Sequence, residues 1–139
     1  MNKIKQIAAF GQKLMVLDSM DNVLELISSE AKNLLRSERC SIFIVDREDQ
    51  MLWTTISDGI GKIVISLDSG IVGETYQTKK PQLVNSPYDD PRFLPSIDKK
   101  TGYVTRNIIT VPIYDSKRDI VGIIQLLNKS RFDYDEEDL

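Results

Sequence analysis

The stretch Ser69-Gly70-Ile71-Val72-Gly73 could bind an anion through its backbone. If a helix begins at Ile71 and Val72, their N–H groups have no partner inside the helix, and the helix dipole is positive there. A phosphate binds at such a place without any charged side chain. The other interpretation is that Ser69 caps the helix and the glycines only form a tight turn, and the spacing alone favours this second interpretation.

A second candidate is the long polar stretch at residues 85–106 with its exit toward Asn107. A loop of this length in a compact domain is usually a lid, a binding loop or a disordered segment. Thr101 and Thr105 stand four residues apart, so a helical turn would place both hydroxyls on one side. Spacing alone favours a solvated loop here.

A third candidate is the run 128–132, Asn-Lys-Ser-Arg-Phe, which precedes an acidic tail. Asn128 and Lys129 can cap a turn or pair with an acid elsewhere, and the alternative is a plain exit from a strand. The paired acids at 89–90 and 136–137 have no visible partner for acid–base chemistry, and we interpret both pairs as solvated.

The composition excludes several classes of site. The 139 residues contain no His, which removes Ser-His-Asp and Cys-His catalysis, histidine-bearing zinc sites and His-ligated haem. The single cysteine, Cys40, permits no internal disulfide and no thiolate metal cage, and it begins an apolar run typical of a core strand. We therefore expect no catalytic residue, no metal and no bound cofactor.

The charge is small and uneven. The net charge of −3 argues against a nucleic acid partner. The last seven residues hold five acids, so removing those five leaves the rest of the chain at +2, which is compatible with a small anionic ligand. No apolar run approaches the roughly 20 residues of a membrane span, and no signal peptide is visible, so we expect a cytoplasmic protein.

The elements that must position these residues follow from the periodicity of apolar side chains. Apolar residues recur at helical spacing over residues 2–16 and 22–36, and later runs are rich in β-branched residues. The predicted strands are 40–45, 51–56, 63–67, 82–84, 108–114 and 120–127, with a short helix over 71–78. Because mostly tight turns join the strands, the sequence predicts an α+β fold with a central antiparallel sheet, the N-terminal helices on one face, and short helices plus a long loop on the other.

Four stretches together resemble the GAF domain of the cyclic-nucleotide-binding type, found in cyclic nucleotide phosphodiesterases and cyanobacterial adenylyl cyclases. They are residues 40–43 (Cys-Ser-Ile-Phe), 70–73 (Gly-Ile-Val-Gly), 101–108 (Thr-Gly-Tyr-Val-Thr-Arg-Asn-Ile), and Asn128-Lys129 with Phe132 and Glu136-Glu137. The resemblance covers residues 21–139 and leaves 1–20 as an N-terminal helix or linker. It also implies that the family's C-terminal helix is truncated here.

The resemblance implies a six-stranded antiparallel sheet of the GAF/PAS-like kind, with a ligand pocket roofed by the long loop. Ser41 and Asp58 would lie at the base edge of the nucleotide, and the Ile71 and Val72 amides would hold the cyclic phosphate. The lid and the last strand would supply the remaining contacts, from Asp98, Thr101, Thr105 and Gln125.

The resemblance gives a structural role to Asn128, Lys129, Phe132, Glu136 and Glu137, in which a Lys–acid pair holds the lid side of the domain. This sequence departs from the pattern at several positions. Glu136 replaces an Asp, Ser57 stands where an aromatic can stack on the base, Gln125 replaces an acid of some relatives, and Leu94 replaces a tyrosine that can help hold the phosphate.

The implied function is that of a regulatory sensor domain rather than an enzyme. It would bind cAMP or cGMP, relay binding to an absent output domain, and form a homodimer through its helices. The alternative is a GAF domain that binds no small molecule and serves as a dimerisation or signal-transmission module.

Overall fold

The structure, a computed structural model, describes residues 3–5, 7, 20–57, 63–130 and 133–139. A six-stranded sheet of order β3-β2-β1-β6-β5-β4 forms its centre, and every neighbouring pair is antiparallel. The strands are β1 Ser37–Asp46, β2 Met51–Ser57, β3 Val64–Ser66, β4 Gln82–Val84, β5 Ile108–Tyr114 and β6 Ile120–Lys129. The predicted α+β fold with its antiparallel sheet is confirmed.

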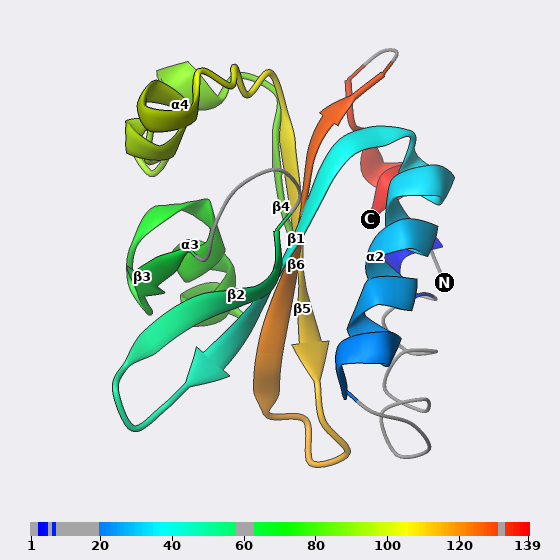
Figure 1. Cartoon of the computed structure of the whole chain (residues 1–139), viewed down its shortest axis with the longest axis vertical. Coiled ribbons are helices and arrows are strands. Elements are labelled where there is room, and N and C mark those ends of the chain that lie inside the picture. The colour runs from blue at the N-terminus through cyan, green and yellow to red at the C-terminus, as the bar shows by residue number, and fades with distance from the viewer. Residues whose placement is uncertain (1–2, 6, 8–19, 58–62, 131–132) are drawn as a thin grey trace.

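The helices cover both faces of the sheet. Helix α2, Met20–Leu35, lies on one face, and α3, Gly70–Thr78, and α4, Ser96–Thr101, lie on the other (Figure 1). Two 3₁₀ turns, η1 at Pro87–Asp89 and η2 at Glu136–Asp138, complete the described elements. Among the described residues, no helix combines the length and the apolar character needed to cross a membrane.

Helix α2 packs on the sheet through one apolar face. Leu24, Ile27, Ala31 and Leu35 recur at helical spacing and are at most 2% exposed. They meet the side chains of alternate residues of β1, β5 and β6 in one core cluster. Residues 3–5 and 7 are helical, and Ile4 joins the same cluster. The rest of the helix predicted at 2–16 lies outside the described residues.

The long predicted loop contains more regular structure than its sequence indicates. It forms η1 and α4, and Gly102 ends α4 in the left-handed conformation at φ 78°. A six-residue helix is too short to display an apolar period, which explains why the sequence pattern does not indicate it. Strands β1 and β6 also run further than predicted, because Ser37 pairs with Lys129 at the end of their ladder.

Gly122 allows the two central strands to approach each other closely. It lies in β6 opposite Ile44 of β1 and Ile113 of β5. A Cβ atom at this position would lie 2.8 Å from the carbonyl oxygen of Phe43. The Phe43 oxygen and the Gly122 backbone that would carry this Cβ belong to paired strands, so neither can move without disturbing the ladder.

We expect Gly122→Ala to lower the free energy of unfolding by about 2–3 kcal/mol, because overpacking against rigid backbone is costly. Gly102→Ala is the matched control. Its φ is positive, but a Cβ there meets nothing within 4 Å, so strain alone should cost about 1 kcal/mol. Urea unfolding of both variants measures the difference, and an equal loss in the two would contradict the close approach at Gly122.

Candidate ligand pocket

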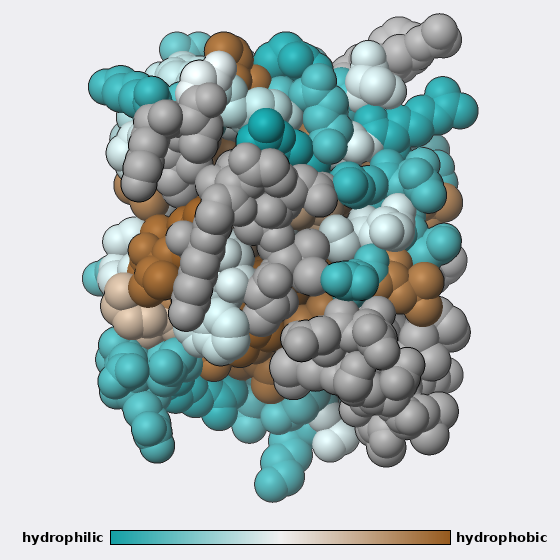
Figure 2. Space-filling view, viewed as in Figure 1, coloured by the Kyte–Doolittle hydropathy of each residue, from teal (hydrophilic) through white to brown (hydrophobic). Residues whose placement is uncertain are grey.

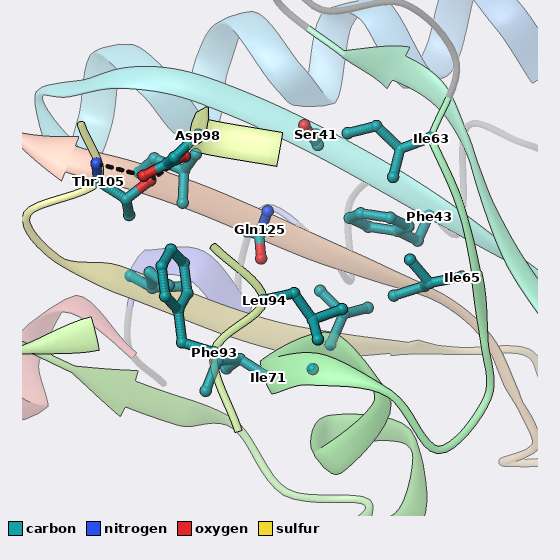
Figure 3. Close-up of a pocket in the computed structure, with 14 residues that line it drawn as sticks. Ser41, Phe43, Ile63, Ile65, Ile71, Phe93, Leu94, Asp98, Thr105 and Gln125 are labelled. Atoms are coloured by element: carbon teal, nitrogen blue, oxygen red, sulfur yellow. Dashed lines mark hydrogen bonds between the residues drawn. The ribbon is translucent and has the colours of Figure 1, made fainter. Parts of the chain in front are cut away.

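A cavity lies between the sheet and the layer formed by α3 and residues 85–106, here called the lid (Figure 3). Its volume is about 70 Å³. Residues from β1, β3 and the residue before it, β5, β6, α3 and the lid contribute to the walls. The lining residues are Ser41, Phe43, Ile63, Ile65, Gly70, Ile71, Val72, Phe93, Leu94, Asp98, Thr105, Ile108, Gln125 and Leu127.

A row of polar residues crosses the sheet on the floor of this cavity. Ser41 of β1 lies opposite Gln125 of β6, which lies opposite Thr110 of β5. The Thr110 hydroxyl is paired with the Thr75 hydroxyl of α3 and thereby ties that helix to the sheet. Ser41, only 4% exposed, and Gln125 both line the cavity, and no described residue hydrogen-bonds to either side chain.

The start of α3 opens toward the cavity without a side-chain cap. The first intrahelical bond runs from the Gly73 N–H to the Ser69 carbonyl at 3.0 Å, which leaves the Gly70, Ile71 and Val72 N–H groups without a described partner. The Ser69 hydroxyl instead bonds to Ser66 at 2.7 Å. The capping interpretation of Ser69 therefore fails, and the open amides carry the positive end of the helix dipole.

Asp98 and Thr105 both reach the cavity, and they are bonded to each other. The buried Asp98 carboxylate accepts hydrogen bonds from the Thr105 N–H at 2.8 Å and the Thr105 hydroxyl at 3.0 Å. It also accepts one from the Tyr88 hydroxyl. These bonds join η1, α4 and the approach to β5 into one layer. The carboxylate is therefore already supplied with donors before any ligand is present.

The helical turn considered for Thr101 and Thr105 does not form. Helix α4 ends at Thr101, and Gly102 reverses the chain before Thr105. The side chain of Thr101 lies outside the described part of the chain. Asp58 and Phe132 also lie outside the described residues, so their predicted roles stay predictions.

Asn128 is the centre of a hydrogen-bond network at the exit of the lid. Its side chain is fully buried, and its backbone has a positive φ of 59°. The amide nitrogen donates to the Val104 carbonyl at 2.8 Å and to the Tyr103 hydroxyl at 2.9 Å. The amide oxygen accepts from the backbone N–H groups of Arg106 and Asn107. One side chain thus satisfies several groups of a segment that has no ladder partner of its own.

Lys129 forms an ion pair with a different acid from those expected. Its ammonium lies 2.7 Å from Asp138 Oδ2, and the side chains are 17% and 5% exposed. Glu136 and Glu137 are exposed in η2, so the expected pairing through these acids is wrong. The reason is the 3₁₀ turn, in which Asp138 folds back to accept the Asp135 N–H at 3.0 Å and so faces Lys129.

The first residue of the lid is tied to the C-terminal segment. Asn85 donates through Nδ2 to the Tyr134 carbonyl and accepts through Oδ1 from the Tyr134 N–H, each at 3.1 Å. The other end of the lid is held by Asn107, whose side-chain oxygen accepts the Lys129 N–H at 2.9 Å. One end of the lid is therefore bonded to Tyr134, which follows β6, and the other end is bonded, through Asn107, to Lys129, the last residue of β6.

A second charged pair stiffens the lid near its middle. Arg92 bonds to Asp90 through two guanidinium nitrogens, at 3.0 and 2.7 Å, and to the Gln82 side chain of β4 at 2.9 Å. The hydrogen bonds from Arg92 hold the pKa of the Asp90 carboxyl below its ordinary value. The lid is thus anchored to the sheet just before Phe93 and Leu94.

The apolar walls and Tyr88 were not singled out from the sequence as parts of a site. Phe43, Ile63 and Ile65 lie in apolar strand-like runs, and such a run indicates burial but does not indicate a ligand site. On the face seen in Figure 2, hydrophobic residues gather at mid-height, between hydrophilic regions above and below. The lid itself exposes Tyr88, Leu94 and Val104.

Comparison with known proteins gives a consistent result. A family model described as the GAF domain matches residues 19–139. The chain is 29% identical to a probable 3',5'-cyclic phosphodiesterase of Caenorhabditis elegans, over 80% of this chain and 17% of that protein. It is 32% identical to the dual 3',5'-cyclic-AMP and -GMP phosphodiesterase 11A of Takifugu rubripes, over 84% of this chain and 15% of that protein. The chain therefore spans less than a fifth of the length of these relatives.

Solved structures share the fold at low sequence identity. The GAF domain from a phosphoenolpyruvate-protein phosphotransferase of Coxiella burnetii superimposes with a TM-score of 0.77 at 16% identity, covering 97% of this chain and 83% of that one. The free methionine-R-sulfoxide reductase from Neisseria meningitidis gives 0.75 at 14% identity, covering 97% and 78%. At these identities the likeness shows the fold alone.

We expect Asn128→Ala to lower the free energy of unfolding by about 2–4 kcal/mol, because it leaves several backbone groups of the lid exit without partners. Asn33→Ala, at an exposed position of α2, is the control and should change stability by less than about 0.5 kcal/mol. Asn128→Asp keeps the acceptor and should lose less than Asn128→Ala. A loss in Asn128→Ala no larger than in the control, measured by urea unfolding, would show that the network is dispensable.

The Asp90–Arg92 pair predicts a definite pH dependence. Because the pKa of Asp90 is lower in the folded than in the unfolded chain, its contribution to stability is complete above the unfolded value and is lost as the pH falls through the folded one. In a carboxyl titration followed by NMR, Arg92→Gln should raise the pKa of Asp90. The stability difference between Arg92→Gln and the parent should shrink below about pH 4. A pKa of Asp90 that is the same in both proteins would contradict the assignment.

Proposed function

Because the chain belongs to the GAF family, a regulatory domain type, we propose that it senses a cyclic nucleotide, cAMP or cGMP. The ligand would bind in the cavity under the lid, and its binding would be relayed to an output domain of a larger protein. Relatives named as cyclic phosphodiesterases, one of them a dual cAMP and cGMP enzyme, support this ligand class. Such relatives also support a role as a regulatory part of a signalling enzyme.

The observation that carries the proposal is the pair of polar side chains on the cavity floor. A polar side chain that lines a cavity without a protein partner is available to bond to a ligand or to water. The Ser41 hydroxyl, in a residue 4% exposed, and the carboxamide of the half-buried Gln125 bond to no described residue, and both side chains line the cavity. A hydroxyl and a carboxamide each offer a donor and an acceptor, which suits the mixed edge of a base or a ribose.

The unpaired amides at the start of α3 would donate hydrogen bonds to the phosphate. Ile71 and Val72 present N–H groups where the helix dipole is positive. Asp98 is the one charged side chain among the described lining residues, and its oxygens already accept three hydrogen bonds. A site built from amides rather than cations suits the single negative charge of a cyclic phosphate better than the two charges of a phosphomonoester.

The lid connects the cavity to the C-terminal segment, so ligand binding would be transmitted through it. A ligand shifts a conformational equilibrium only by its difference in affinity for the two states. The lid contacts the cavity through Phe93, Leu94, Asp98 and Thr105, and it contacts the C-terminal segment through Asn85. A nucleotide that changes the contacts between the lid and the cavity therefore also acts on the C-terminal segment, because Asn85 bonds the lid to that segment.

A domain that binds no small molecule is the second candidate, and the size of the cavity favours it. About 70 Å³ is well below the roughly 300–1,000 Å³ of typical ligand sites. On this alternative the chain would act through its helices as a dimerisation or signal-transmission module. Leu26 and Leu34, 44% and 43% exposed on α2, would contribute to a homodimer contact in either case.

Calorimetric titration with cAMP and with cGMP tests the ligand directly. We expect saturable binding of at least one, weakened about three- to tenfold by Ser41→Ala and by Gln125→Leu, since each removes one hydrogen bond. Ser29→Ala, at an exposed position of α2 on the opposite face, should leave the affinity unchanged. Absence of heat and of a thermal shift with both nucleotides at millimolar concentration would refute the proposal in favour of the second candidate.

A further inference from the structure

The side chain of Leu94 lies against the first residue of α3. Its Cδ1 and Cγ atoms are 3.1 and 3.3 Å from the place where a Cβ of Gly70 would stand. The backbone oxygen of Arg92 is 3.8 Å from the same point. Figure 3 shows Leu94 reaching from the lid into the cavity, between Gln125 and the start of α3. Gly70 permits this approach because it has no side chain and adopts a φ of +71°.

This position matters because the start of α3 is the part of the cavity with open amides. A phosphate oxygen must come within about 2.7–3.2 Å of the Ile71 and Val72 nitrogens to bond to them. Both residues are 3% exposed, and the cavity offers about 70 Å³. While Leu94 keeps its present position, the cavity has no room for a nucleotide whose phosphate lies at these amides.

The lid is built so that Leu94 can move while the residues around it stay in place. Arg92 is fixed on one side by Asp90 and Gln82, and Asp98 is fixed on the other by Thr105 and Tyr88. The Leu94 side chain is 38% exposed, and among the described contacts its backbone makes no hydrogen bond. Displacing it therefore breaks no described hydrogen bond and separates only apolar contacts.

We propose that Leu94 is a displaceable plug over the anion-binding start of α3. In the empty domain it covers the Gly70, Ile71 and Val72 amides, and it swings outward when a phosphate takes its place. The plug lowers the affinity for nucleotides by the free energy of its displacement, and its effect is largest for a ligand whose phosphate must reach the amides. The proposal rests on the proposed function for the identity of the ligand, but the covering of the amides can be tested without any ligand.

Hydrogen exchange of the parent and Leu94→Ala, measured by NMR without ligand, is the first test. We expect the Gly70, Ile71 and Val72 amides to exchange about tenfold faster in Leu94→Ala, because water then reaches them. Val104→Ala is the matched control, since Val104 is a 63% exposed apolar residue next to the lid exit and does not line the cavity. Val104→Ala should leave the exchange rates of these three amides unchanged. Thermal unfolding of both variants verifies that they are folded.

Titration of the same proteins is the second test. We expect Leu94→Ala to bind the preferred cyclic nucleotide about five- to tenfold more tightly than the parent, and to show a smaller gain for the corresponding nucleoside, which has no phosphate to reach the amides. Val104→Ala should match the parent with both ligands. Weaker nucleotide binding by Leu94→Ala would overturn the plug and make Leu94 a ligand contact instead.

The two tests separate the plug from the proposed function. Unchanged exchange at the start of α3 in Leu94→Ala, with nucleotide binding intact, overturns the plug and leaves the cyclic-nucleotide proposal standing. Faster exchange with no nucleotide binding in any of the proteins supports the covering role of Leu94 and overturns the cyclic-nucleotide proposal.

Discussion

The arrangement of the pocket depends on one buried carboxamide. Asn128 ends β6 in a left-handed conformation, and its side chain holds the backbone from Val104 to Asn107. These backbone groups lead into β5 and are at least partly buried, so leaving them without partners is costly. Because this segment is held, Thr105 stands where it can bond to Asp98, and Asp98 can bond to Tyr88. The side chain of Asn128, near the end of β6, therefore determines the position of the lid over the sheet.

The pocket that results is a compromise between stability and recognition. Its floor keeps Ser41 and Gln125 without described partners, and the start of α3 lacks a side-chain cap. Groups of this kind add less to the stability of the empty domain than paired groups would, because no described residue bonds to them. The apolar side chains of Leu94 and Phe93 line the same cavity. On the proposed function, each polar group that the fold leaves unpaired would be available to the ligand.

Much of the fold could be predicted from the sequence, because its determinants are local. The β-branched runs of β5 and β6 and the apolar period of α2 each lie within one short segment. Helix α4 could not be predicted in this way, since it is held by Asp98 and Gly102 rather than by an apolar face. The sequence pattern also predicts the wrong partner for Lys129. The choice of Asp138 over its neighbours depends on the geometry of a 3₁₀ turn, which composition does not indicate.

The parts of the site that lie within one segment of the chain could be indicated by the sequence. The glycines before the apolar helix indicate the start of α3 as an anion-binding candidate, although the spacing alone favours a Ser69 cap, which the structure lacks. The polar row on the floor is not indicated in this way, because Ser41, Gln125 and Thr110 meet only through the register of three strands. The pairing of Asp98 with Thr105 likewise requires the reversal at Gly102. Residues far apart in the chain share a site through pairings that a single sequence cannot display.

The two bonds of Asn85 to Tyr134 have a consequence for the entropy of the lid. A flexible loop loses freedom when its ends are brought together, and this loss grows slowly with its length. Here the folded domain itself holds the ends together, through Asn85 at one side and Asn107 at the other. The freedom that two separate loop ends would have is therefore already removed in the folded domain. Closing the lid over the proposed ligand would cost only the entropy of ordering the residues between these two fixed ends.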